Sequence, residues 1–312
     1  MDITNLVDCH CIRIMGRQSR ALQVRVGSGS VVSTFWNPKE FFPLAGRIFT
    51  LFMALLVAQG ATGAELQPRT LAAWETYVSS TERRIAAELD DGQRFLAADF
   101  LNETESNTLR ALLSNGRVYI RKMETADESG QRIQVKGGMI HHWFGSIFVP
   151  DVNLDSLIQW VQNYDQHQQY FNEVEESKLL SREGPTFHLF FRLRRKKIVT
   201  VVYNTEHTAV YRQHDPRRVS SRSFTTRIAQ LEDPGTPSEK EKPVGNDSGF
   251  LWRLNSYWRF QEQEGGVFVE CESLSLSRGI PFLLSWIFKG YVESVPRESL
   301  QNTLTSIREG IH

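Results

Sequence analysis

The stretch from Ser256 to Ile311 constrains the fold of this chain more than any other, because it reads as a β-hairpin followed by a closing helix. Segments of alternating apolar and polar residues flank Gly265 and Gly266, a pair suited to a two-residue loop with positive φ. A hairpin folded about this pair predicts three cross-strand pairs: Trp258 with Ser273, Arg259 with Glu272, and Phe260 with Cys271.

One face of this predicted hairpin is apolar and the other is polar. The apolar face carries Trp258, Phe260, Val267, Val269 and Cys271, and the polar face carries Arg259, Gln261, Glu270 and Glu272. Such alternation is typical of an antiparallel sheet that packs one face on the core and leaves the other in water. We therefore expect Arg259 to be exposed and to contribute little to stability.

The closing helix is predicted from an apolar stripe near the C-terminus. Its residues recur at the spacing i, i+4, i+7 and i+11, and they are Leu300, Leu304, Ile307 and Ile311. Pro296 is well placed for a first helical turn. A helix with one apolar stripe needs an apolar surface to cover, and the hairpin offers one.

The composition narrows the class of partner. The 36 basic and 36 acidic residues balance, with a pI near 7.1, so a nucleic-acid partner is not expected. Of the three cysteines, Cys9 and Cys11 precede a long apolar run and Cys271 lies on the predicted buried face. We expect Cys271 to be a core residue without an intrachain disulfide.

Residues 1–64 are predicted to form an N-terminal region that ends in a secretory signal at 48–64. An apolar run from Ile48 to Ala58 follows Arg47 and is followed by small residues, as in a signal peptide, and it is short for a membrane span. Cleavage would leave a mature, secreted or periplasmic chain beginning near Glu65. An uncleaved, membrane-anchored form is the alternative. The stretch ahead of the run is long for a signal, so a later translation start is also expected.

The rest of the chain divides into an accessory α/β extension at 65–136 and a main domain at 137–312. In the extension, spacing predicts helices at 67–89 and 103–114 and a strand at 117–123. In the main domain we expect a strand at 139–149, a helix capped by Asn153, and an exposed, mobile loop at 231–249 rich in Pro, Gly and charge. Further strands are expected at 173–181, 186–194, 197–211, 218–229, 250–262 and 267–276.

This order of elements resembles the START-like helix-grip superfamily, also called SRPBCC, which includes lipid-transfer domains and polyketide cyclases. The resemblance covers residues 137–311 and rests mainly on the ending YWRF...GGVFVECESLSLSRGIP...VPRESLQNTLTSIREGI, which is similar to that of uncharacterised secreted bacterial members. It implies an α+β fold in which an antiparallel sheet wraps around a long C-terminal helix, with an apolar cavity between them. The N-terminal helical extension departs from the minimal fold.

The hairpin, the apolar segment IPFLLSWIF and the closing helix together predict the lining of that cavity. The candidate lining residues are Trp258, Phe260, Val267, Val269, Phe282, Trp286, Leu300 and Leu304. The basic run at 192–197 falls at a predicted hairpin tip, where it is either a solvated turn or a contact with anionic lipid. The contact residues would be Arg194, Arg195, Lys196 and Lys197.

Three functions fit this architecture. The first is a secreted or periplasmic binding or carrier protein for a hydrophobic small molecule or lipid. The second is a cyclase- or hydrolase-like enzyme that uses the same cavity, although no catalytic, metal-binding or cofactor-binding motif is present in the sequence. Its polar pair would come from His188, Arg192, His207, Tyr203, Glu262 and Glu270. The third is an envelope interaction protein whose cavity is filled by side chains.

Overall fold

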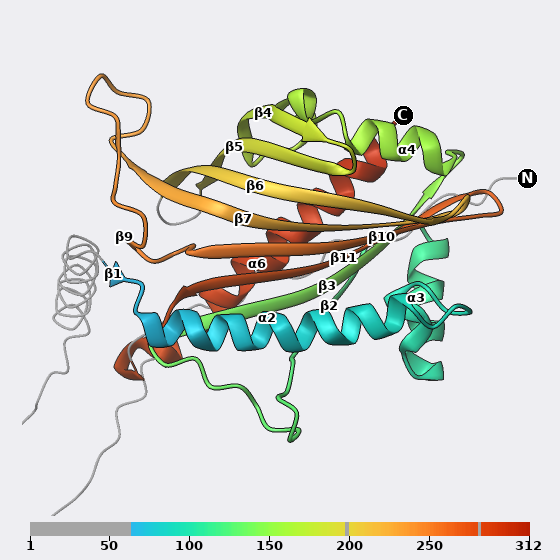
Figure 1. The fold of residues 1–312 in the computed structure, drawn as a ribbon, viewed down its shortest axis with the longest axis horizontal. Coiled ribbons are helices and arrows are strands. Elements are labelled where there is room, and N and C mark those ends of the chain that lie inside the picture. The colour runs from blue at the N-terminus through green and yellow to red at the C-terminus, as the bar shows by residue number, and fades with distance from the viewer. Residues whose placement is uncertain (1–63, 197–199, 280–281) are drawn as a thin grey trace, which may run out of the picture. The chain divides into compact units, whose positions relative to one another are not determined.

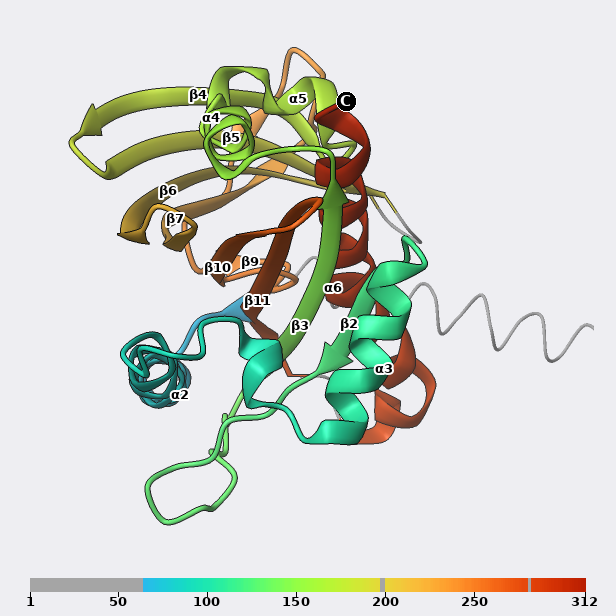
Figure 2. The same ribbon diagram turned by 90° about the vertical axis from the view of Figure 1, so that its right-hand side faces the viewer.

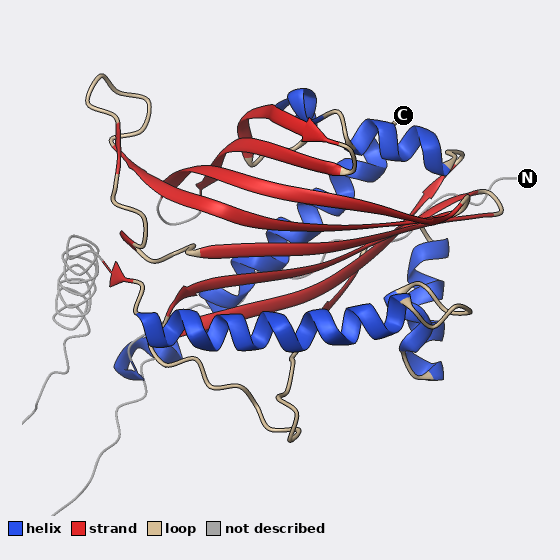
Figure 3. Cartoon of the chain, in the orientation of Figure 1, coloured by secondary structure: helices blue, strands red, loops and turns tan. Residues whose placement is uncertain are grey.

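The computed structural model describes residues 64–196, 200–279 and 282–312, and for 282–293 it describes the helix but not the side chains. The described residues belong to one compact unit (Figure 3). The predicted signal run and the stretch ahead of it lie outside the described residues.

A nine-stranded antiparallel sheet forms the body of the fold, in the order β2-β3-β11-β10-β7-β6-β5-β4, with β8 paired to β7. The two-residue strands β1 (Ala64–Glu65) and β9 (Asn246–Asp247) pair separately. Every strand predicted for the main domain is present, with ends that differ by a few residues. The strands of the sheet are β2 (Tyr119–Lys122), β3 (Gly138–Pro150), β4 (Val174–Glu183), β5 (Thr186–Lys196), β6 (Thr200–Asp215), β7 (Arg218–Glu232), β8 (Lys240–Glu241), β10 (Arg253–Gln263) and β11 (Gly266–Arg278).

The helices also follow the predicted pattern. Asn102 and Asn153 cap two of them, since their side chains accept from Glu105 N at 2.9 Å and Ser156 N at 2.8 Å. By length and hydropathy, no helix within the described ranges could cross a bilayer. The helices are α2 (Pro68–Leu89), η1 (Ala97–Phe100), α3 (Glu103–Ser114), α4 (Leu154–Val161), η2 (Tyr164–Gln166), α5 (His167–Tyr170) and α6 (Phe282–Gly310).

The closing helix α6 begins earlier than predicted and contains Pro296 in its interior. Proline is favoured in a first turn because it lacks an N–H, and that preference misplaced the start. The predicted stripe is confirmed for Leu300, Leu304 and Ile307, which are buried against the sheet, whereas Ile311 lies just past the end of α6 and is partly buried. Helix and sheet approach closely at Gly145, where an added Cβ would lie 2.5 Å from Leu304 Cδ1. We call the sheet face toward α6 the inner face and the opposite one the outer face.

The hairpin of β10 and β11 has the predicted faces but a different register. Trp258 pairs with Cys271 and Phe260 with Val269, a shift of two residues from the expected pairs. An even shift leaves every side chain on its face. Gly265 takes the turn with φ +82°, whereas a Cβ on Gly266 would lie 2.1 Å from the carbonyl oxygen of Val149 on β3. Gly266 therefore permits pairing with β3 rather than forming the turn.

The outer face is not solvated along β3, β11 and β10, because α2 crosses it (Figures 1 and 2). Trp74 and Tyr77 of α2 pack on Leu274 and Leu276 of β11. Arg259 is only 4% exposed, so the prediction that it faces water is wrong. Alternation identified the two faces, but the helix that covers the outer one comes from the accessory extension.

The loop at 231–249 is more ordered than predicted. It contains β8 and β9, and its Asp247 is buried. Glu239 in the same loop accepts two hydrogen bonds of 2.8 Å from the guanidinium of Arg192 on β5. These contacts fasten the loop to the sheet, although much of its first half is exposed.

Candidate functional site

The inner face changes character halfway along β11. Near the hairpin turn its inward residues are Val267, Val269 and Cys271, and beyond them they are Ser273, Ser275 and Ser277. Pairing with β3 is uninterrupted, so all of them point the same way. The outward residues change in the opposite sense, from Glu270 and Glu272 to Leu274 and Leu276. The inner face therefore has an apolar end and a serine-lined end.

The apolar end gathers most of the predicted lining residues. Phe260, Val267, Val269, Leu300 and Leu304 are buried in one cluster with residues of β3 and α4, and Trp258 packs against its margin with a partly exposed ring. The side chains of the other two candidates, Phe282 and Trp286, lie outside those described. Because these buried residues fill the space between them, Trp258 is the member best placed for a ligand. Contact of any of them with a ligand stays a prediction.

At the serine-lined end, small side chains follow one another across the strands. The registers align Ala209 of β6, Ser223 of β7, Ser256 of β10 and Ser273 of β11. We call Ser223, Ser256 and Ser273 the serine row. Phe187 on β5 and Trp143 on β3 continue the line on either side. Because small residues lie between large ones, the floor of the inner face is lowest along this row.

The hydroxyl groups of the row are unequally engaged. Ser256 Oγ accepts from Trp258 Nε1 at 3.0 Å. The hydroxyls of Ser223 and Ser273 have no hydrogen-bond partner among the described residues, and both residues are half-buried. The hydroxyls of Ser223 and Ser273 are thus available for further hydrogen bonds on the inner face.

Buried but neutral polar groups lie beside the row on β6. Thr205 Oγ1 donates to Phe191 O at 3.0 Å and therefore accepts from His207 Nε2 at 2.9 Å. Burial lowers the pKa of His207 to about 4, so its ring is uncharged at neutral pH. Burial likewise raises the pKa of Tyr211 to about 12, and its hydroxyl lies 2.7 Å from that of Tyr164.

The residues proposed for a catalytic pair do not converge. His188 and Glu270 lie on the outer face, on β5 and β11, whereas His207 and Tyr203 lie on the inner face of β6. No group of three or more His, Cys, Asp or Glu side chains within the described residues is placed to hold a metal ion.

The other two members of that set have structural partners. Arg192 pairs with Glu239 and with Glu175 of β4. Glu262 Oε2 accepts from Leu154 N at 2.7 Å, at the first residue of α4. Both side chains therefore fasten neighbouring elements together.

Sequence reasoning missed a buried set of charges between α2 and the outer face. We call Arg84, Glu88, His142, Arg259, Glu270 and Glu272 the outer ion cluster. Arg259 pairs with Glu88 and donates to Phe95 O at 2.9 Å, and Arg84 pairs with Glu88 and Glu272. The alternation of charge along β11 was the available signal, and it was interpreted as solvation.

Two carboxylates of this cluster differ in protonation. Glu270 is 1% exposed and accepts from Ala97 N at 2.6 Å and Ala98 N at 3.1 Å, and burial raises its pKa to about 7. Glu272 is also buried, but hydrogen bonding to His142 at 2.7 Å and the charges of His142 and Arg84 outweigh burial and lower its pKa. Along β11, the outer face thus carries buried carboxylates, whereas the inward side chains of the same strand are uncharged.

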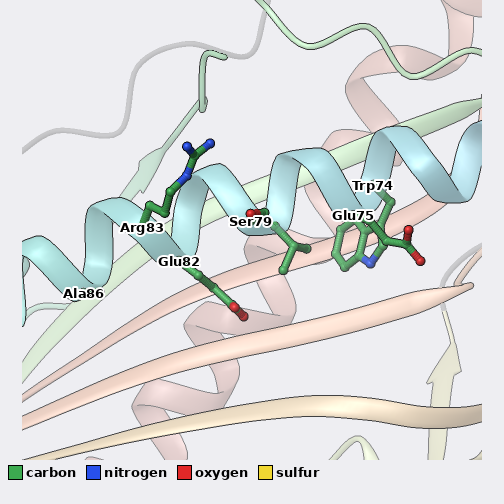
Figure 4. A pocket seen from close by; sticks show the side chains of 7 residues that line it. Trp74, Glu75, Ser79, Glu82, Arg83 and Ala86 are labelled. Carbon is green, nitrogen blue, oxygen red and sulfur yellow. The ribbon is translucent and has the colours of Figure 1, made fainter. Parts of the chain in front are cut away.

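A separate hollow of about 420 Å³ lies along a flank of α2 (Figure 4). It is shallow, and Trp74, Ser79 and Glu82 contribute to its lining. Glu82 accepts from Tyr257 Oη at 2.8 Å and from Arg222 Nε at 2.7 Å, so it joins α2 to β10 and β7. This hollow marks the seam between the helix and the sheet.

The predicted basic contact with a membrane is partly neutralised by ion pairs. Arg194 pairs with Glu175, and Arg195 pairs with Glu173 and with Glu298 of α6. Lys196 is exposed and Lys197 lies outside the described residues. Contact between this run and a membrane stays a prediction.

The strand order and the position of α6 confirm the predicted START-like helix-grip fold with an N-terminal extension. No family model matches the chain, and no curated protein matches its sequence. Three similar solved structures are a STAR-related lipid transfer protein from Xanthomonas axonopodis, the human StarD13 lipid transfer and protein localization domain, and the Zhui aromatase/cyclase from Streptomyces sp. R1128.

The first is 14% identical, with a TM-score of 0.39 over 62% of this chain and 98% of that chain. The second is 8% identical, with a TM-score of 0.38 over 68% of this chain and 98% of that chain. The third is 10% identical, with a TM-score of 0.37 over 55% of this chain and 94% of that chain. These values are low, so the fold assignment rests on this chain's own topology.

Proposed function

We propose that the protein binds and carries a hydrophobic small molecule or lipid between the inner face of its sheet and α6. The observation that carries this proposal is the serine-lined end of the inner face. There, small side chains lower the floor between aromatic residues, and the Trp258 ring stays partly exposed although it faces a helix. A surface with apolar walls and few polar groups is the usual form of a ligand site.

The contrast between the two ends supports the same proposal. At the apolar end, side chains from β10, β11 and α6 bury one another completely. The serine-lined end has no such interlocking set among the described residues, although the same helix spans it. A binding protein needs a rigid core beside a space for its guest, and the apolar end supplies that core.

Native mass spectrometry of the purified chain from Glu65 onward tests this proposal. We expect a co-purifying small molecule that is lost from the Trp258→Ala variant. An equivalent change at Phe224, a half-buried aromatic residue on the outer face of β7, serves as the matched control and should leave the bound molecule in place. A ligand-free protein that also takes up no lipid on incubation would contradict the proposal.

We also propose that the protein acts outside the cytoplasm, on the basis of the apolar run at 48–58 and the small residues after it. N-terminal sequencing of the protein from its native host is the test. A first residue near Glu65 would support export, whereas an intact Met1 on a cytoplasmic protein would contradict it.

A further inference from the structure

The floor of the serine-lined end carries hydrogen-bonding groups but no charged side chain. At this end of the sheet, the described inner-face positions of the strands from β3 (starting at Met139) across to β5 (ending at Phe191) contain no Asp, Glu, Lys or Arg. Arg195, further along β5, is already paired with Glu173 and Glu298. An anion or a cation placed on this floor would find no opposite charge on the sheet.

Several polar groups of the floor lack partners. Ser275 is only 6% exposed, yet its hydroxyl has no hydrogen bond among the described residues, and by alternation it points to the inner face beside Ser273. The second ring nitrogen of His207 is likewise without a described partner. Together with Ser223 and Ser273, these groups provide both donors and acceptors.

These two observations restrict the ligand in opposite directions. A purely hydrocarbon guest would leave several buried polar groups unpaired, which is unfavourable. A charged guest would lose its hydration without gaining an ion pair from the sheet, which is more unfavourable still. The part of a guest that contacts this floor is therefore best matched when it is uncharged and carries oxygen atoms that can hydrogen-bond.

We propose that the ligand of this site is a neutral molecule with several hydroxyl or carbonyl oxygens on an apolar skeleton, rather than a fatty acid or a phospholipid. This inference rests on the proposed function and deepens it by naming the ligand class. The serine row and Ser275 bind the oxygens, and Trp143 at the β3 end of the row and Trp258 beside it on β10 contact the skeleton.

Three probes with one shared oleyl chain separate charge from hydrogen bonding. They are 1-monooleoylglycerol, which is neutral and carries several oxygens, oleyl alcohol, which is neutral with one hydroxyl, and oleate, which is an anion. Native mass spectrometry of the delipidated protein, titrated with each probe below its micellar concentration, should rank affinity in that order. We expect oleate to bind at least about ten-fold more weakly than the monoacylglycerol.

A double variant, Ser223→Ala with Ser273→Ala, tests the role of the hydroxyls. It should weaken monooleoylglycerol binding by roughly ten-fold or more and leave oleyl alcohol within about three-fold. Ser146→Ala is the matched control, because Ser146 Oγ is buried without a partner in the described structure but lies on the outer face. Ser146→Ala should bind all three probes as the unaltered protein does.

The outcomes separate this inference from the proposed function. Equal or tighter binding of oleate, or co-purification of an anionic lipid, would overturn the inference and leave the carrier function standing. Insensitivity of monooleoylglycerol binding to the double variant would also overturn it. Failure of all three probes to bind a protein that co-purifies with nothing would contradict the carrier function, and the inference with it.

Discussion

The inner and outer faces of the sheet are both buried where β10 and β11 run side by side, but different interactions hold the two contacts. On the inner face, Phe260, Val267 and Leu304 pack without polar groups. On the outer face, Arg259 and Glu270 are equally inaccessible and are satisfied by α2 and η1. The inner-face contact tolerates any apolar side chains of suitable shape. The outer-face contact depends on specific hydrogen-bond and ion-pair partners for its buried charges.

The largest test of this comparison removes the inner contact. Truncation after Val295 deletes half-buried Ile311 and the buried Leu300, Leu304 and Ile307, and the three buried side chains alone contribute about 1.5 to 3 kcal/mol each, or roughly 5 to 9 kcal/mol in all. Typical domains are stable by only about 5 to 15 kcal/mol. We expect no cooperative unfolding transition by circular dichroism. A cooperative transition in the truncated protein would mean that the inner contact is dispensable.

A single substitution tests the outer contact. Arg259→Ala would leave Glu270 buried without its nearest cation and leave Glu88 with Arg84 alone, and we expect it to lower the free energy of unfolding by about 3 to 5 kcal/mol. Arg83→Ala is the control, because Arg83 on α2 forms an exposed pair with Glu128 worth at most about 1 kcal/mol. Urea denaturation measures both. Equal effects would show that the outer contact is no stronger than a surface ion pair.

Within the inner face, two aromatic residues of β10 separate packing from binding. Phe260→Ala should cost about 3 to 5 kcal/mol, as for a fully buried ring. Trp258→Ala should cost less, about 1 to 3 kcal/mol, because its ring is partly exposed, and should abolish ligand retention. Thermal unfolding with native mass spectrometry distinguishes them. The reverse ranking would place the binding site at the apolar end.

The two faces should also respond oppositely to pH. Glu270 has a folded pKa of about 7 against an ordinary 4.5, so the folded protein holds more protons and stability falls as pH rises from about 4.5 to 7. His207 has a folded pKa of about 4 against 6.5, so the unfolded chain holds more protons and stability rises from about pH 4 to 6.5. Each contribution is at most about 3 kcal/mol.

Variants isolate these two contributions. Glu270→Gln should make the free energy of unfolding rise more steeply between pH 4.5 and 7, and His207→Gln should make it rise less steeply between pH 4 and 6.5. Urea denaturation at a series of pH values measures both slopes. Unchanged slopes would mean that neither group keeps its shifted pKa in solution.

The sequence predicted the helices and strands better than it predicted which helix packs on which face of the sheet. The helix at 103–114 was predicted with its observed ends, because Asn115 and Gly116 stop it, and in the structure Asn102 caps its start. The faces of β10 and β11 followed from alternation, which survives an even shift in register. These features depend on residues that are close together in the chain.

What was missed depends on distant parts of the chain. The burial of Arg259 requires Glu88 and Phe95, more than 160 positions away, and nothing local in β10 distinguishes a solvated arginine from one covered by a helix. The role of Gly266 requires the backbone of β3. The serines of this end are visible in the sequence SLSLSR, which begins at Ser273. The alignment of Ser273 with Ser256 and Ser223, however, depends on the register of β11, β10 and β7.

The change of polarity along β11 has a consequence for how the molecule opens. Among the described residues, the apolar contacts of α6 lie on the inner face near the hairpin end of β11, and Trp74 and Tyr77 of α2 pack on the outer face against Leu274 and Leu276, toward its other end. These two sets of contacts, the anchors of α6 and α2, therefore lie on opposite faces of β11 and near opposite ends of the strand. Local opening at one anchor exposes few apolar groups of the other, so amide hydrogen exchange should resolve the two helices as separate cooperative units joined through the central strands.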